Sequence, residues 1–291
     1  MATRRFNLRN RGVFTASIEE QLLAVRAGTY IDHFALELSA DLTAATTTAI
    51  ETFLSLLNPF QFKVNGDVRF SLRGRDLYAL NALYLGRTPG FFEGAAGEDD
   101  KVFGLRIPIW YTVAERDSIS WLATRVAIVN VSGEDISVAY TTKEGVQRRG
   151  YYHIVELTGT SPATTGVARA VDFLPRVGIL QGLLFFSTSI PTATADTITL
   201  DEIRLYRNDV LDVVATWQDL GAEPMFTGNL GTASAFVDIL ANYRWLDLGD
   251  DPWDLRADRV AVDIDFQVAS EAFRIIPVYL VPAGGAAAAA R

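Results

Sequence analysis

Apolar and polar residues alternate along several stretches of the chain, most clearly near its end. From 260 to 268 every second residue is apolar: Val260, Val262, Ile264, Phe266 and Val268. A period of two is typical of a strand that buries one face and exposes the other. A second β-rich run covers 273–281, where Pro277 suggests an edge strand or a bulge because proline donates no hydrogen bond to a ladder. We therefore expect two closing strands whose partners come from far upstream.

The same patterns predict the other elements. Longer strands are expected over 29–39, 60–72, 102–113, 173–190 and 197–206, and shorter ones over 125–131, 136–142, 151–157 and 235–240. Asn65-Gly66 predicts a tight hairpin turn within 60–72. Helical spacing and capping residues predict short helices over 17–26, 41–57, 75–85 and 208–220. The helices are too few for alternating strand and helix units around a parallel sheet.

We predict an all-β fold, namely a single eight-stranded antiparallel jelly roll (a β-sandwich or barrel) with a few short helices. The short strands of 115–170 are interpreted as a small β subdomain inserted into this barrel. The predicted divisions are a basic N-terminal arm, 1–27; the jelly-roll barrel, 28–114 and 171–283; the insertion, 115–170; and a flexible tail, 284–291.

Composition narrows the possible functions. The chain has 291 residues and no cysteine, which excludes disulfides, thiol catalysis and cysteine-ligated metal. Its two histidines, His33 and His153, are too few for a three-histidine metal site. A net charge of −9 argues against nucleic-acid binding by the domain as a whole. No apolar run reaches membrane-spanning length and no signal peptide is apparent, and we expect no catalytic residue, metal or cofactor.

Two groups of residues are candidates for binding. Arg4, Arg5, Arg9 and Arg11 all precede the first acidic residue, Glu19. They suit contact with an anionic surface, whether lipid headgroups or nucleic acid, or they belong to a solvated chain end.

The second group is an acidic aromatic loop over 245–254, with Trp245, Asp247, Asp250, Asp251 and Trp253 as its ligand candidates. Its carboxylates suit calcium and its indole rings suit stacking on a sugar, although the spacing departs from the usual calcium-loop pattern. A solvated turn with a tryptophan in the core explains the same residues.

Three stretches carry a resemblance to a known family: MATRRFNLRNRGVF at the start, KVFGLRIPIWYTV over 101–113, and FRIIPVYLVPAGG over 273–285. With these stretches and its length, the chain resembles the larger major capsid protein of tailless, icosahedral, membrane-containing phages that infect Thermus. The resemblance implies a structural, non-enzymatic protein of the virion capsid, assembled in the host cytoplasm. It implies a single upright jelly roll, with 115–170 as a surface tower.

The resemblance also implies partners. These are copies of the chain itself, a second, smaller single-barrel capsid protein that completes pseudo-hexameric capsomers, and an internal viral membrane that the four N-terminal arginines would contact. No specific nucleic acid is implied. Two alternatives remain: a carbohydrate- or receptor-binding β-sandwich that uses the 245–254 loop, and, least favoured, a glycosidase-like enzyme with two converging carboxylates.

Overall fold

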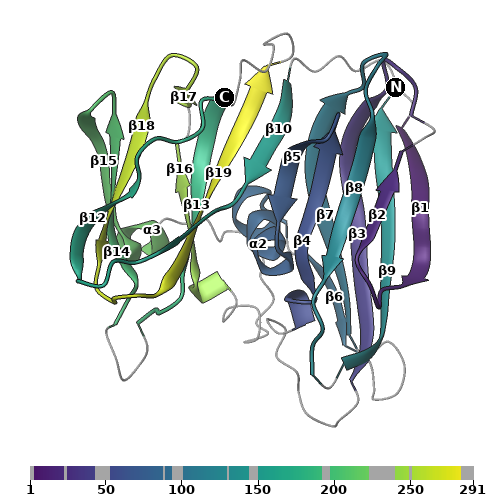
Figure 1. Cartoon of the computed structure of the whole chain (residues 1–291), viewed down its shortest axis with the longest axis horizontal. Coiled ribbons are helices and arrows are strands. Elements are labelled where there is room, and N and C mark those ends of the chain that lie inside the picture. The colour runs from purple at the N-terminus through teal and green to yellow at the C-terminus, as the bar shows by residue number, and fades with distance from the viewer. Residues whose placement is uncertain are drawn as a thin grey trace. The chain divides into compact units, whose positions relative to one another are not determined.

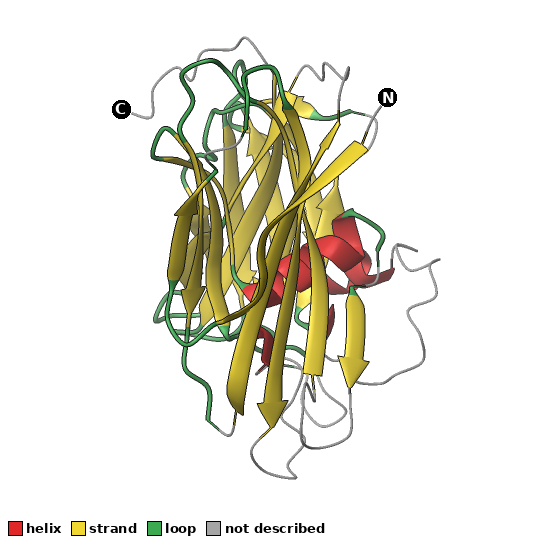
Figure 2. Ribbon diagram, turned by 90° about the vertical axis from the view of Figure 1, so that its right-hand side faces the viewer, coloured by secondary structure: helices red, strands yellow, loops and turns green. Residues whose placement is uncertain are grey.

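The fold is described on a computed structural model of the chain (Figure 1). The described residues are 3–22, 25–42, 53–87, 89–93, 101–129, 131–143, 150–191, 197–222, 240–248 and 251–282. They divide into two compact units, Met1–His153 and Ile154–Arg291, which we call the first and second units. Strands dominate both units, as Figure 2 shows in yellow. Among the described residues, no helix combines the length and the apolar character that a membrane crossing requires.

The first unit consists of strands with one helical segment between them. The segment is α2 (Gly74–Ala79) continued by the π-helix η1 (Leu80–Tyr84). The strands are β1 (Thr3–Val13), β2 (Ile18–Gln21), β3 (Tyr30–Leu42), β4 (Leu57–Val64), β5 (Asp67–Leu72), β6 (Gly90–Glu93), β7 (Lys101–Thr112), β8 (Ile119–Arg125), β9 (Val131–Lys143) and β10 (Gly150–Val155).

These strands form two antiparallel layers. One sheet has the order β1-β9-β3-β7-β6, and in the other the strands lie in the order β10-β5-β4-β8-β2. If β6 and β10 are set aside, eight strands remain. Numbered along the chain, they pair as first-eighth-third-sixth in one sheet and second-seventh-fourth-fifth in the other. This is the strand order of a jelly roll, in which two Greek keys fold over each other.

Alternating side chains place the core between the two layers. Phe34 on β3 points inward and meets the rings of Phe60 and Phe62 on β4, with centroids 5.9 and 5.7 Å apart. Trp121 on β8 lies almost parallel to Phe60, 6.1 Å away. All four rings are buried. Their burial removes large apolar areas from water and holds the two sheets together.

The second unit repeats the plan. Its elements are β11 (Leu157–Thr160), β12 (Gly166–Val171), β13 (Ile179–Ser187), β14 (Leu200–Arg207), β15 (Val210–Thr216), α3 (Trp217–Ala222), β16 (Tyr243–Asp247), β17 (Trp253–Asp254), β18 (Val260–Phe266) and β19 (Ala272–Pro282). β11, β19, β13 and β16 pair in that order, and so do β12, β18, β14 and β15, while β17 adds to β13. The eight main strands thus have the same order as in the first unit.

The prediction of one eight-stranded jelly roll is therefore corrected: the described chain contains two such sets of strands in succession. The predicted insertion, 115–170, holds β8 and β9 of the first set and β11 and β12 of the second. Its ends do not coincide with the boundary between the units, which falls between His153 and Ile154. Its role as a surface tower stays a prediction.

Several predicted elements are confirmed. The hairpin turns at Asn65-Gly66, where both residues have the positive φ that a tight turn requires, 54° and 84°. The strands expected over 29–39, 102–113 and 260–268 correspond to β3, β7 and β18, and the helix expected over 75–85 corresponds to α2 and η1.

Other predicted elements are wrong. The stretch expected to be a helix over 17–26 contains the strand β2, which pairs with β8. The helix expected over 208–220 is mostly β15, which pairs with β14, and helix begins only at Trp217. The expected loop over 245–254 begins inside β16 and ends in β17. The helix expected over 41–57, the strand over 235–240 and the tail over 284–291 lie largely or wholly outside the described residues.

Candidate functional site

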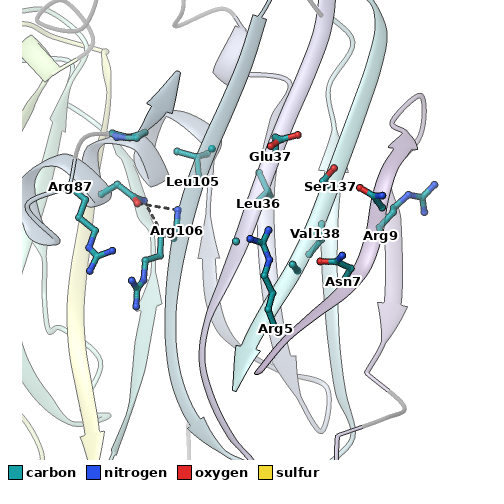
Figure 3. Close-up of a pocket in the computed structure, with 16 residues that line it drawn as sticks. Arg5, Asn7, Arg9, Leu36, Glu37, Arg87, Leu105, Arg106, Ser137 and Val138 are labelled. Atoms are coloured by element: carbon teal, nitrogen blue, oxygen red, sulfur yellow. Dashed lines mark hydrogen bonds between the residues drawn. The ribbon is translucent and has the colours of Figure 1, made fainter. Parts of the chain in front are cut away.

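A hollow of about 650 Å³ lies on the outer face of the sheet formed by β1, β9, β3 and β7 (Figure 3). The side chains on the inner face of these strands are large, whereas those on the outer face in the middle of the sheet are small. The floor of the hollow therefore consists of short side chains or none: Ala35, Gly104, Ser137 and Ala139. Because nothing long rises from the floor, the sheet surface itself is open to a ligand or a partner.

The rim of the hollow is cationic. Figure 3 shows Arg87 and Arg106 on one side, and Arg5, from β1, on the other. Arg9 is the fourth arginine of the lining, and Glu37 is the acidic residue in it. Burial and the nearby charge of Arg87 both lower the pKa of Arg106.

The π-helix η1 fixes the position of Arg106. The side-chain amide of Asn81, buried on η1, donates to the carbonyl oxygen of Arg106 at 2.8 Å and accepts from its backbone N–H at 3.1 Å. Asn81 therefore completes the hydrogen bonding of β7 at this point in the manner of a neighbouring strand. The guanidinium group of Arg106 is thus presented from a backbone that is held on both sides.

Three basic side chains contact Asp32 at one end of the same sheet. Its carboxylate, almost fully buried at a bulge of β3, accepts from Lys143 Nζ at 2.8 Å, from Arg106 Nη2 at 3.0 Å and contacts His33 Nδ1 at 2.8 Å. Burial raises the pKa of Asp32, but the hydrogen bonds from Lys143 and His33 outweigh it and the pKa is lowered. The pKa of His33 is lowered as well, chiefly by burial. Asp32 is therefore an ionised anchor that ties β3, β7 and β9 together.

The structure brings together two of the four N-terminal arginines. Arg4, Arg5, Arg9 and Arg11 all lie on β1, which pairs with β9. Arg5 and Arg9 line the hollow, and Arg9 also pairs with Glu20 at 3.1 Å. Arg11 lies at a bulge with a φ of 44°, and its N–H donates to Ser137 Oγ at 3.0 Å. Contact of these arginines with a membrane stays a prediction.

The second predicted group consists of buried rings and exposed carboxylates. The rings of Trp245 and Trp253 are buried, with 2% and 5% of their residue surface exposed, so neither offers a face to a sugar. Asp247 and Asp251 are exposed. Asp250 lies outside the described residues. Within the described ranges no three histidine or acidic side chains cluster as metal ligands would.

Sequence reasoning missed Arg87, Arg106 and Asn81. Arg106 falls on a polar position of the alternating strand 102–113, so its outward direction was available from the pattern. Arg87 and Asn81 carry no such signal, because their place depends on how η1 packs beside β7.

One strand of the second unit exposes apolar side chains. β15 is the last strand in the order β12-β18-β14-β15, so one of its edges is unpaired within the described sheet. Val210, Leu211 and Val214 on it are 67%, 47% and 51% exposed. An exposed apolar edge strand favours association with another chain.

Comparisons with known proteins place the fold. No family model matches the chain, and no curated protein matches it. Among solved structures, the STIV MCP, from Sulfolobus Turreted Icosahedral Virus, matches with a TM-score of 0.69 and 14% identity over 97% of both chains. The major capsid protein P2 from bacteriophage PM2 matches with a TM-score of 0.61 and 12% identity, covering 98% of this chain and 100% of that one.

A third solved structure agrees. VP54 of the virus PBCV-1 matches with a TM-score of 0.63 and 11% identity, covering 100% of this chain and 97% of that one. The chain has the fold of viral major capsid proteins. The likeness extends over residues of both units.

Proposed function

We propose that this protein is a viral major capsid protein whose copies associate side by side into an icosahedral shell. The observation that carries the proposal is the likeness in fold to viral major capsid proteins over almost the whole length of both chains. The surface supports it further, since a shell is built from broad, repeated contacts rather than around one deep ligand pocket. The exposed edge strand β15 and the cationic hollow are surfaces of that kind.

The finer assignments are part of the proposal. They are a virion of the lineage of membrane-containing Thermus phages, assembly in the host cytoplasm, and capsomers completed by a second, smaller single-barrel protein over an internal membrane. The sequence resemblance supports each of them. The carbohydrate-binding alternative has less support, because Trp245 and Trp253 are buried.

The test of the capsid role is quantitative mass spectrometry on density-purified particles from the source culture. We expect hundreds of copies of this chain per lipid-containing particle, with a second abundant small protein beside it. A few copies per particle, or a chain that stays in the soluble fraction, would contradict the shell role. Particles without lipid or without the small protein would contradict only the finer assignments.

Membrane contact is better tested by point substitutions than by deleting the N-terminal residues, because a deletion would remove β1 from the first jelly roll. Replacing Arg4 and Arg11 by glutamine keeps the strand and removes two charges. If these residues contact an anionic membrane, flotation with anionic liposomes should recover less of the variant than of the unchanged protein. Equal recovery would remove these two arginines from the model.

A further inference from the structure

Charge is divided unequally between the two units. The first unit contains 17 basic and 17 acidic residues, whereas the second contains 9 basic and 18 acidic ones. The net charge of −9 therefore belongs to the second unit alone. A cationic hollow on a neutral unit and an acidic second unit give two copies of this chain complementary charges.

Two arginines of the hollow are open to a partner. Arg9 pairs with Glu20 and Arg106 with Asp32. Arg5 and Arg87 form no ion pair with the described residues, although both line the hollow. Their charges are therefore available to carboxylates that arrive from outside.

The end of the β14–β15 hairpin in the second unit carries exposed acidic side chains. Its turn, Asn208-Asp209, has φ values of 52° and 67°, which are typical of a two-residue hairpin turn. Asp258 holds the base of the turn, since its carboxylate accepts from Arg207 Nε at 2.9 Å and from Asn208 Nδ2 at 2.8 Å. Asp209 remains exposed at the tip.

The residues that follow the tip add apolar area and a second acid. Val210 and Leu211 are exposed, and so is Asp212, which forms a loose ion pair with Arg207 at 3.9 Å. The hairpin end thus combines two carboxylates with two uncovered apolar side chains on an unpaired edge. The hollow has complementary features, with two arginines at its rim and small residues on its floor. Its volume of about 650 Å³ is large enough to receive several side chains.

We propose that the β14–β15 hairpin end of one copy docks in the cationic hollow of another copy, with Asp209 and Asp212 beside Arg5 and Arg87. The proposal rests on the proposed capsid function and names one of its contacts. Because the two surfaces differ, the contact is head-to-tail, and repetition of such a contact closes a ring or extends an array. Val210 and Leu211 would cover the bare floor of the hollow.

The test compares self-association of full-length variants by sedimentation velocity at low and high salt. Replacing both Arg5 and Arg87 by glutamate should raise the dissociation constant of self-association at least tenfold. Added salt should weaken association of the unchanged chain, because exposed charges are screened. Glutamates at Arg26 and Arg116, both exposed on the first unit outside the hollow, change the net charge equally and should leave association unchanged.

A charge swap identifies the partner surface. Adding Asp209→Arg and Asp212→Arg to the Arg5→Glu and Arg87→Glu chain should restore association. Circular dichroism verifies that each variant is folded. Hollow variants that associate like the unchanged chain would overturn the contact and leave the capsid role standing. Loss of binding to anionic vesicles without loss of self-association would instead assign the hollow to lipid headgroups. An unchanged chain that stays monomeric at all concentrations would also overturn the contact, whereas the capsid role is decided by the copy number in particles.

Discussion

At Asp32 a single buried carboxylate satisfies two cationic side chains and contacts a histidine. The cost of burying its charge is offset only while these partners are present, so the cluster contributes to stability as a set. Removing the negative charge leaves Lys143 and Arg106 facing each other without an anion. The sheet of β3, β7 and β9 then loses the group that joins its three strands.

We predict that Asp32→Asn lowers the free energy of unfolding by about 3 kcal/mol, because it leaves paired charges without their partner. The measurement is the urea midpoint at pH 7. Asp251→Asn is the control, since this exposed aspartate should change stability by less than about 0.5 kcal/mol. Equal midpoints for the two variants would show that Asp32 carries no structural role.

The buried side chain of His153 makes the stability of the folded protein depend on pH. Burial lowers its pKa from the ordinary 6.5 to about 4. The unfolded chain therefore binds a proton between these values and the folded chain does not, so stability is lost as pH falls from 6.5 towards 4. The contribution is on the order of 3 kcal/mol.

We expect His153→Gln to reduce the loss of unfolding free energy between pH 7 and pH 4.5, because glutamine does not titrate. Urea midpoints at both pH values, for the variant and the unchanged chain, measure it. If both proteins lose the same stability between the two pH values, His153 does not cause the pH dependence.

At the scale of elements, the alternation of apolar and polar residues predicted strands that bury one face, such as β3 and β18. It failed for β15, which is largely exposed on both faces. The three-residue spacing of Leu211, Val214 and Trp217 predicts a helix where β15 lies. In the structure β14 supplies the hydrogen bonds of this segment, and its outward apolar residues belong to the exposed surface. Long-range pairing overrides local spacing there.

β13 contains a position where only a hydrogen atom fits. A Cβ at Gly182 would overlap the ring of Trp245 and the carbonyl oxygen of Leu246, both on β16. The bare glycine leaves room for the indole ring of Trp245, which is buried.

We predict that Gly182→Ala destabilises the protein by about 2 kcal/mol, because neither a strand carbonyl nor a buried indole can move away easily. Gly166→Ala is the comparison: nothing lies within 4 Å of its Cβ, and strain from its φ of 123° should cost only about 1 kcal/mol. Thermal unfolding of both variants measures the difference. A smaller effect at Gly182 than at Gly166 would contradict the packing argument.

At the scale of the whole molecule, the all-β class was predictable from the sequence, whereas the strand order and the duplication were not. The short strands of 115–170 suggest an insertion, yet the boundary between the units falls inside this stretch, after His153. The hollow was half predictable: Arg5 and Arg9 stand out in the sequence, whereas Arg87 and Arg106 reach it only through the packing of η1 and β7. Both the duplication and the hollow depend on pairings between distant strands, which a single sequence does not show.

Each unit has its own set of eight jelly-roll strands and its own core. We therefore expect the fragment 1–155 to fold by itself, with β-rich circular dichroism and a cooperative urea transition. A fragment without a cooperative transition would show that the first jelly roll depends on residues of the second unit.

The pairing of β1 with β9 has a consequence for synthesis. The strand β1 forms hydrogen bonds with a strand more than 120 residues later, so it must wait unpaired until β9 leaves the ribosome. Arg5 reaches the hollow only when the first jelly roll closes. A nascent chain therefore presents no finished docking surface, and the contact with other copies becomes available only after the first unit has been translated. Translation itself thus sets the order in which folding and shell building occur.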